Sequence, residues 1–282
     1  DGLIHENDAA RRMSKAAAGP GIGFSDVSEG RVNLLAEADG LLKINVEALN
    51  QINSIDEIVF STLHTNQTVR AKKALGGTRI VPLVTEVERI EAVEKICREN
   101  YPVVEVKPFV DCKVGIVTTG SEVYSGRIED KFGPVLHVKF AELGSTMMRQ
   151  EFVSDSVEMT VKAIHGMLND GAELIAVTGG MSVDPDDQTP ASIRAAGGRV
   201  ITYGSPIFPG AMFMLAYIGD VPVVGLPGCV MYYQASVFDL VVPRLLAGDT
   251  VTRADIVAMG HGGFCQGCAE CKYPLCPFGK SV

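Results

Sequence analysis

The spacing of hydrophobic residues divides the chain into two stretches with different periods. Between residues 24 and 84, short apolar runs are separated by Gly, Asn and Asp, which is typical of strands joined by tight turns. An Ala-rich segment over residues 1–20 and a segment over 86–98 flank this stretch with helical spacing. We therefore predict a small, mostly β N-terminal domain with flanking helices over residues 1–110. Its expected strands are 32–35, 40–44, 58–63 and 79–83.

From Lys113 onward, apolar runs alternate with Gly-rich polar loops and amphipathic segments. This repeat is typical of a parallel sheet covered by helices on both faces. The fold class that follows is α/β: a mostly parallel three-layer α/β domain over 111–250, preceded by the small β domain and followed by a cysteine-rich tail over 251–282. The expected strands are 114–118, a run ending at 153, 174–177, 200–203 and 221–226, and the expected helices are 132–143, 157–168, 190–196 and 231–246.

Three of the expected strands end in loops rich in Gly, Ser and Thr, at residues 118–130, 178–187 and 225–228. Ligands of parallel sheets collect beyond the carboxyl ends of the strands. Glycine lets the backbone approach a ligand closely, and hydroxyl groups add hydrogen-bond donors. The carboxylates of Asp184, Asp186 and Asp187 are oxygen ligands suited to Mg²⁺. Gly, Asp and Pro are also ordinary turn residues, but three such loops at strand ends favour a binding site.

The run from Lys113 to Gly248 resembles the domain shared by molybdopterin adenylyltransferases and molybdopterin molybdenumtransferases, and is nearest the molybdenumtransferase type. Four motifs carry the resemblance: Thr-Gly-Ser-Glu at 119–122, Gly-x-Ile-x-Asp at 126–130, Thr-Gly-Gly-x-Ser-x(4)-Asp at 178–187, and Gly-Leu-Pro-Gly at 225–228. The combination of the Thr-Gly-Gly loop with Gly-Leu-Pro-Gly is the most specific of these signals. The resemblance covers about half of the chain.

The resemblance implies a transferase of molybdenum cofactor biosynthesis that inserts molybdate into adenylylated molybdopterin and releases the adenylate, with Mg²⁺ as a cofactor. It implies that Asp187, helped by Asp184, is catalytic and lies near the metal or the adenylylated phosphate. It also implies that the loops hold molybdopterin through Thr119, Gly120, Ser121, Glu122, Asp130, Asp155, Thr178, Gly179, Gly180, Ser182, Pro227 and Gly228.

The sequence departs from the family pattern at four places. Ala211 replaces a lysine expected to contact an anion, Cys229-Val230 replaces Asn-Pro, Asp155-Ser156 replaces Asp-Asp, and Asp184 stands where glycine is common. Losing a cation and gaining a carboxylate weakens oxyanion binding unless a divalent metal compensates. Two alternatives therefore stay open beside the enzyme: a non-catalytic molybdopterin carrier or redox sensor, and nucleotide pyrophosphatase or amidase chemistry, because competence-damage proteins have a similar domain.

The C-terminal tail contains Cys265, Cys268, Cys271 and Cys276 with the spacing C-x2-C-x2-C-x4-C, followed at once by Pro277. Bacterial ferredoxins use C-x2-C-x2-C-x3-C-P, which is one residue shorter before the last cysteine. Zinc sites with four thiolates generally separate two C-x2-C pairs by a longer loop. We therefore predict a metal site at these cysteines, with an iron–sulfur cluster favoured and zinc as the alternative.

The charge and hydropathy of the chain limit the classes of partner that we expect it to bind. The formal net charge is −9 and basic doublets occur only at Arg11-Arg12 and Lys72-Lys73, so no nucleic-acid partner is expected. The most apolar stretch, residues 205–218, contains Pro206, Pro209 and Gly210 and is too short to span a bilayer, so no membrane partner is expected. Scattered cysteines favour the cytoplasm. The expected ligand is a small pterin, and a homo-oligomer or a molybdoenzyme partner stays open.

Overall fold

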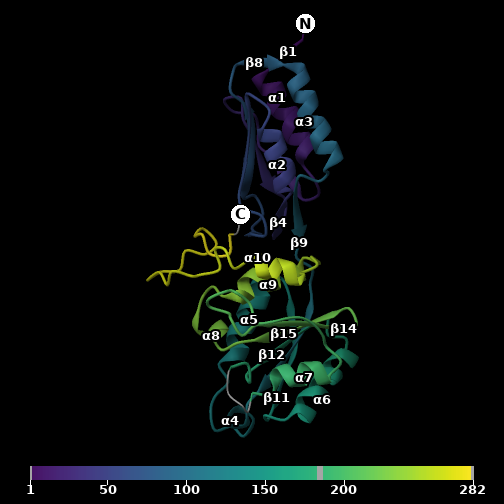
Figure 1. Ribbon diagram of the computed structural model, residues 1–282, viewed down its shortest axis with the longest axis vertical. Coiled ribbons are helices and arrows are strands. Elements are labelled where there is room, and N and C mark those ends of the chain that lie inside the picture. The colour runs from purple at the N-terminus through teal and green to yellow at the C-terminus, as the bar shows by residue number, and fades with distance from the viewer. Residues whose placement is uncertain (1, 183–186, 281–282) are drawn as a thin grey trace. The chain divides into compact units, whose positions relative to one another are not determined.

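The computed structural model describes residues 2–182 and 187–280, and these fall into two compact units, one ending at Pro108 and the other beginning at Phe109 (Figure 1). The α/β fold class expected from the hydrophobic pattern is confirmed. Within the described residues, no helix is both long and apolar enough to cross a membrane.

Unit 1 combines short antiparallel sheets with helices that cover them. The helices α1 and α3 lie side by side (Figure 1). Their residues Met13, Ile90 and Val93 are buried in one core cluster. The strands pair in the orders β2-β3-β7-β5, β6-β4-β9 and β1-β8. The elements of unit 1 are β1 (Leu3–His5), α1 (Glu6–Ala17), β2 (Ile22–Phe24), β3 (Val32–Ala36), β4 (Gly40–Ile44), α2 (Val46–Asn53), β5 (Ile58–Thr62), β6 (Thr68–Val69), β7 (Ala74–Ile80), β8 (Val84–Glu86), α3 (Val87–Glu99) and β9 (Val104–Pro108).

Unit 1 differs from the sequence expectation in several features, since β1, β2, β6, β8 and β9 were not among the expected strands. The strand expected at 79–83 begins earlier, because β7 spans Ala74–Ile80 and pairs with both β3 and β5. The helix α2 was not expected. It begins after Asn45, whose side chain accepts a hydrogen bond of 3.1 Å from the backbone N–H of Ala48, and Ala48 and Ile52 are its buried residues. An Asn cap of this kind satisfies an otherwise unpaired donor in the first helical turn.

Unit 2 is built on one sheet with the strand order β11-β10-β12-β15-β14-β13. The strands β11, β10, β12 and β15 are mutually parallel, while β14 runs antiparallel to β15 and to β13. The elements of unit 2 are β10 (Lys113–Thr119), α4 (Ser121–Tyr124), α5 (Phe132–Glu142), β11 (Thr146–Val153), α6 (Val157–Asn169), β12 (Leu174–Thr178), α7 (Thr189–Ala195), β13 (Arg199–Tyr203), β14 (Met214–Ile218), β15 (Val221–Leu226), α8 (Cys229–Tyr232), α9 (Val237–Leu246) and α10 (Arg253–Ala258).

Helices cover both faces of this sheet, as Figure 1 shows. On one face, Phe140 of α5 and Phe238 of α9 pack edge to face with ring centroids 5.2 Å apart, over strand residues such as Ile116. On the other face, Ile164 of α6 and Ile193 of α7 pack with other strand residues in a separate core cluster. Because both faces are covered, the inner strands read as almost continuous apolar runs, and β12 is buried along its whole length.

The long helix expected over 231–246 is two helices. Ser236 ends the irregular segment after α8 and starts α9 with a capping box, in which its backbone N–H donates to Asp239 Oδ2 over 2.8 Å. That reciprocal cap fixes a new helix start inside an apolar run. The apolar stretch 205–218 holds β14, whose antiparallel pairing to β15 the sequence analysis did not foresee.

Candidate functional site at the carboxyl edge of the sheet

The three loops identified in the sequence leave the same edge of the sheet. β10 ends at Thr119, β12 at Thr178 and β15 at Leu226, and these strands are adjacent and parallel. We call this edge, with the loops that follow the three strands, the carboxyl edge. The carboxyl edge of a parallel sheet is where such folds bind ligands.

The loops after β10 and β12 are in direct contact. Gly179 has φ +79°, and a Cβ added there would lie 2.2 Å from the backbone oxygen of Thr119. Gly180 has φ +50° and is similarly confined, by the hydroxyls of Thr189 and Thr119. The Thr189 hydroxyl donates a hydrogen bond of 2.8 Å to the Gly179 carbonyl and lies 3.3 Å from the Thr119 hydroxyl. Both glycines are required by the close backbone approach of these two loops.

The loop after β12 also covers β15. The side chain of Met181 is buried, and its Sδ and Cε atoms lie 2.9 Å from where a Cβ on Gly225 would stand. After Gly225 the chain turns at Pro227 and Gly228 into α8, where the Val230 N–H donates to the Pro227 carbonyl over 3.1 Å. Gly228 is exposed, and the nearest atom to a Cβ there is Met231 Cε at 4.0 Å. This is the most open backbone position of the third loop.

Two of the expected site carboxylates hold the loops in place. Asp155, which follows β11, accepts hydrogen bonds from the backbone N–H and the hydroxyl of Ser121 over 2.8 and 2.9 Å. Asp130 accepts from the backbone N–H groups of Phe132 and Gly133, both over 2.9 Å, at the start of α5. The first backbone N–H groups of a helix have no partner within the helix, so a carboxylate that accepts hydrogen bonds from them stabilises the helix start.

Asp130 also belongs to a polar network under the loops. Gln150 of β11 donates to Asp130 Oδ2 over 2.7 Å and to the Thr118 hydroxyl over 2.8 Å, and the Thr178 hydroxyl donates to Thr118 over 3.2 Å. Thr118 and Thr178 are buried, so these hydrogen bonds order the strand ends directly beneath the loops. Sequence reasoning did not identify Gln150 or Thr189. The position of Thr189 directly before Pro190 at an expected helix start was the one available signal.

The remaining expected site residues lie on the exposed side of the same loops. Ser121 and Glu122 of α4 and Ser182 are exposed, and Gly120 is partly exposed. The side chain of Asp187 accepts a hydrogen bond of 2.6 Å from the Ser182 N–H and is partly exposed. Asp184 lies outside the described residues. The arrangement brings hydroxyls, close backbone and one partly exposed carboxylate to one edge, which is the composition of a site for a phosphorylated ligand.

Ala211 lies near the same edge, because β14 begins at Met214 opposite Gly225 of β15. The Ala211 carbonyl accepts a hydrogen bond of 2.9 Å from the Ser205 N–H. Cys229, at the start of α8, is partly buried, and burial raises the pKa of its thiol. A raised pKa disfavours the thiolate at neutral pH and thus a nucleophilic role for Cys229.

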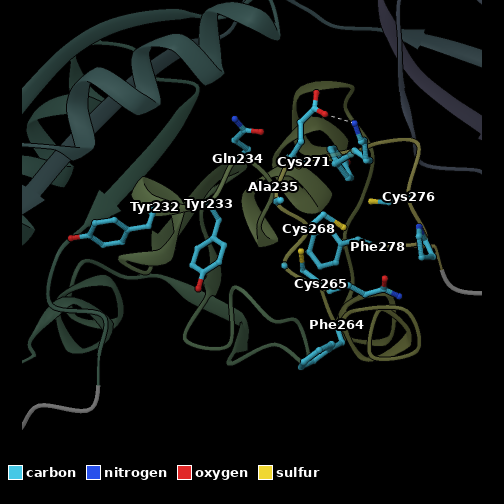
Figure 2. A pocket seen from close by; sticks show the side chains of 17 residues that line it. Tyr232, Tyr233, Gln234, Ala235, Phe264, Cys265, Cys268, Cys271, Cys276 and Phe278 are labelled. Carbon is cyan, nitrogen blue, oxygen red and sulfur yellow. Dashed lines mark hydrogen bonds and ion pairs between the residues drawn. The ribbon is translucent and has the colours of Figure 1, made fainter.

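The four tail cysteines lie elsewhere in unit 2, in a segment without helix or strand that we call the cysteine segment (residues 264–278). All four line one cavity of about 320 Å³, together with Tyr232, Tyr233, Phe264 and Phe278 (Figure 2). In the parts of the chain that the structure describes, no three His, Cys, Asp or Glu side chains are close enough to hold a single metal ion. The metal site expected at these four cysteines stays a prediction.

Comparison with known proteins supports the domain family indicated by the loop motifs. Residues 115–247 match the family model described as a probable molybdopterin binding domain. This match spans all three loops of the carboxyl edge. The matched residues lie within unit 2, and the matching family is the one that the motifs resemble.

Among curated proteins, the chain is similar to CinA-like proteins of mycobacteria. It is 30% identical over 90 residues to the one from Mycobacterium sp. (strain MCS), covering 32% of this chain and 21% of that protein. It is 31% identical over 90 residues to the one from Mycobacterium tuberculosis (strain ATCC 25618 / H37Rv), with the same coverage. The chain thus spans about a fifth of the length of these relatives.

Among solved structures, the chain is similar to small proteins of cofactor biosynthesis. The molybdopterin biosynthesis enzyme MoaB from Thermus thermophilus is 18% identical, with 49% of this chain and 98% of that chain covered and a TM-score of 0.39. The tungsten cofactor synthesizing protein MoaB from Pyrococcus furiosus is 20% identical, with 51% and 98% covered and a TM-score of 0.40.

Proposed function

We propose that unit 2 binds molybdopterin or its adenylylated form at the carboxyl edge and acts in molybdenum cofactor biosynthesis as a molybdenumtransferase. The match of residues 115–247 to a probable molybdopterin binding domain carries this proposal, because the matched segment contains every loop of the edge. The reaction that we propose is insertion of molybdate into the pterin dithiolene with release of the adenylate. A molybdoenzyme that receives the finished cofactor is the partner that this role implies.

Different loop residues would make different contacts with the pterin ligand. The pterin phosphate would lie against Gly179 and Gly180, where the left-handed backbone of the two glycines supports a close approach. The Ser182 and Ser121 hydroxyls, both on exposed residues, would add donors. The remaining members of the proposed binding set are Thr119, Gly120, Glu122, Asp130, Asp155, Thr178, Pro227 and Gly228.

Asp187 is the carboxylate that we propose for Mg²⁺ and for catalysis, with Asp184 as its helper. Asp130 and Asp155 already accept two or more hydrogen bonds each from the protein, so their contacts support a positioning role for them. Asp187 accepts the Ser182 N–H through Oδ2, which leaves Oδ1 for a cation. A bound Mg²⁺ would offset the negative charge that the Asp184 and Ala211 departures bring to the site.

A carrier without catalytic activity, or a redox sensor, is the second candidate. Ala211 favours it, because a lysine near this edge would supply the cation that stabilises a transferred oxyanion. The Ala211→Lys variant tests the idea directly. If the chain is a carrier that has lost the cation, the variant should gain affinity for the adenylylated pterin, and that gain should weaken at high salt.

Nucleotide pyrophosphatase chemistry is the third candidate, and the 30% identity to CinA-like proteins over 90 residues favours it. This candidate differs from the first two in its substrate. A pyrophosphatase would hydrolyse a free dinucleotide or nucleotide sugar without molybdate, whereas the transferase needs molybdate, so one assay with and without molybdate distinguishes the two activities.

The deciding experiment supplies the full chain with adenylylated molybdopterin, Mg²⁺ and molybdate under anaerobic conditions and follows AMP. Molybdate-dependent AMP release that is lost in Asp187→Asn supports the transferase, because the amide keeps the shape but not the charge. The matched control is Asp220→Asn, an exposed carboxylate in the turn before β15, at the opposite end of the strand.

Each other outcome identifies a different function. Tight pterin binding without turnover would establish the carrier. AMP release from ADP-ribose without molybdate would establish the pyrophosphatase. Absence of pterin binding at micromolar protein would refute the proposed site altogether.

A further inference from the structure

The cysteine segment has a binding cavity of its own, which the proposed pterin chemistry does not use. The cavity encloses about 320 Å³, a volume at the lower end of the range for ligand sites. Its wall on one side is the segment from Tyr232 to Ala235, and on the other side the four cysteines (Figure 2). Because all four thiols of one short segment line this cavity, a ligand that binds there should be one that thiols bind.

Both ends of the cysteine segment are fixed to the body of unit 2. At its start, the Phe208 N–H donates to the Gly263 carbonyl and the Cys265 N–H donates to the Phe208 carbonyl, each over 2.8 Å. This short bridge sets the position of the first cysteine, because it holds the backbone on both sides of Phe264.

The other end is fixed by aromatic side chains. Phe278 is only 3% exposed and belongs to the same core cluster as Leu240 of α9. The hydroxyl of Tyr273 donates a hydrogen bond of 2.9 Å to the backbone oxygen of Asp239, and its ring lies edge-on to Phe278. Cys271 and Cys276 flank Tyr273, so the last two cysteines are carried by a docked stretch of chain.

The separation of the thiols distinguishes between two kinds of occupant. A single Zn²⁺ holds each sulfur at about 2.3 Å, which brings four thiolates to within about 4 Å of one another. Within the described residues, which include all four cysteines, no three candidate ligands are gathered in that way. All four cysteines line the same cavity, and in a polynuclear cluster the thiolates bind different irons and need not meet at one point.

We infer that Cys265, Cys268, Cys271 and Cys276 hold an iron–sulfur cluster in this cavity. The first three cysteines lie within residues 265–271, and the fourth follows the docked Tyr273, directly before Pro277, in a spacing similar to that of ferredoxins. The aromatic residues Phe264, Tyr232 and Tyr233 line the cavity as well. They are 72%, 72% and 50% exposed, so a cluster here would lie close to solvent, and solvent exposure is one of the properties that set the reduction potential of a cluster.

The cluster would lie against chain that leaves the carboxyl edge. The segment from Tyr232 to Ala235 follows α8 directly, and α8 follows Gly228 of the third loop. The inference does not depend on the pterin proposal, because its ligands, cavity and anchors belong to the cysteine segment, Phe208, the segment from Tyr232 to Ala235 and α9, and none of these is in the proposed pterin-binding set.

The test uses the full chain, produced with abundant iron and purified without oxygen. We expect iron and acid-labile sulfide in equal amounts and a broad visible absorption that dithionite bleaches. Cys268→Ser and Cys271→Ser should each lower the iron content about tenfold or more, because a lost thiolate removes a ligand outright. Gln266→Ala and Ala269→Ser, exposed positions between the same cysteines, are the matched controls and should keep full iron content.

Three results would overturn the inference: one equivalent of zinc without sulfide, iron content unchanged in both serine variants, or a wild-type protein that binds neither metal after reconstitution with iron and sulfide. Circular dichroism of the variants shows whether they fold. Pterin titration of the same samples separates the two proposals. A serine variant that loses the cluster and still binds pterin agrees with both proposals. An iron-free wild-type protein that binds pterin refutes the cluster and leaves the pterin proposal intact.

Discussion

The carboxyl edge and the cysteine segment are both irregular chain on the same α/β unit, but they are held in opposite ways. At the carboxyl edge, backbone packs on backbone: Gly179 leaves no room for a Cβ beside Thr119, and buried hydroxyls join the strand ends below. The cysteine segment is anchored at its two ends, and the thiols between them line a cavity without gathering.

This difference indicates how each region meets its ligand. At the carboxyl edge, Thr119, Gly179 and Thr189 hold one another in place, so we expect that ligand binding against these residues costs little ordering of the chain. The cysteine segment has no helix or strand between its anchors, and a bound metal centre would order the chain around the cysteines further, since metal binding and local folding are coupled in small cysteine sites. The following predictions test that contrast.

The largest effect is expected in thiol reactivity after metal removal. The cysteine segment should react with iodoacetamide rapidly in chelator-treated protein, whereas Cys112, which packs in the sheet core, should stay protected. Burial raises the pKa of Cys112 to about 12. At pH 8 only roughly one in ten thousand such thiols is ionised, against about one in four for an unperturbed cysteine.

Mass spectrometry of the alkylated peptides measures these rates. The Cys112 rate should rise about tenfold per pH unit, because the thiolate fraction grows as pH approaches the pKa. Metal-loaded protein should protect the cysteine segment alone. Equal rates at Cys112 and Cys268 would contradict the contrast between core and segment.

Gly179→Ala should damage the carboxyl edge next most strongly. Its Cβ would stand 2.2 Å from the Thr119 oxygen at a φ of +79°, so the two loops must separate. We expect at least tenfold weaker pterin binding, of order 1.4 kcal/mol, and a lower Tm. Gly171→Ala is the matched control, because its φ of +89° adds the same backbone strain in open space. A loss of binding as large in Gly171→Ala would assign the effect to strain alone.

Phe278→Ala should release the cysteine segment and spare the sheet. Truncating a buried Phe costs about 3–5 kcal/mol when the surrounding structure stays in place. Here the cysteine segment can detach from the core instead, so hydrogen exchange at the Cys265 and Tyr273 amides should accelerate by about tenfold or more, with the amides of β12 unchanged. Leu275→Ala, at an 80% exposed position, should change neither. Faster exchange in β12 would show that both regions unfold together.

The smallest effect concerns acid sensitivity of α10, the helix that leads to the cysteine segment. Burial works to raise the pKa of Asp255, but hydrogen bonds from Thr252 and the charge of Arg244 outweigh it, and the net result is a lowered pKa. A lowered pKa contributes stability above the unfolded value of about 3.9, and this contribution is lost as pH falls through the folded value.

Thermal melts between about pH 3 and 7 measure this contribution. Asp255→Asn should be slightly less stable than wild type at neutral pH and equal to it at the acid end, because protonation removes the same charge. A difference between the two proteins that stays constant with pH would assign the effect to the capping hydrogen bonds instead.

Local pattern determined much of this protein. The alternation of apolar runs and glycine-rich loops was enough to predict the α/β fold, and the motifs at 119–130, 178–187 and 225–228 were enough to indicate the domain family. These signals are local, because a strand that is buried on both faces needs an apolar run, and a close backbone approach needs glycine. The cysteine spacing also predicts a metal site, which stays a prediction.

Tertiary structure decided what depends on residues far apart in the chain. Only the fold shows that Gln150 donates to both Asp130 and Thr118, and that Thr189 joins the loops after β10 and β12. Only the pairing of β14 with β15 brings the segment after Ala211 to the carboxyl edge. Hydrogen bonds and cavities form between side chains that meet through packing, and no local propensity encodes which partners meet.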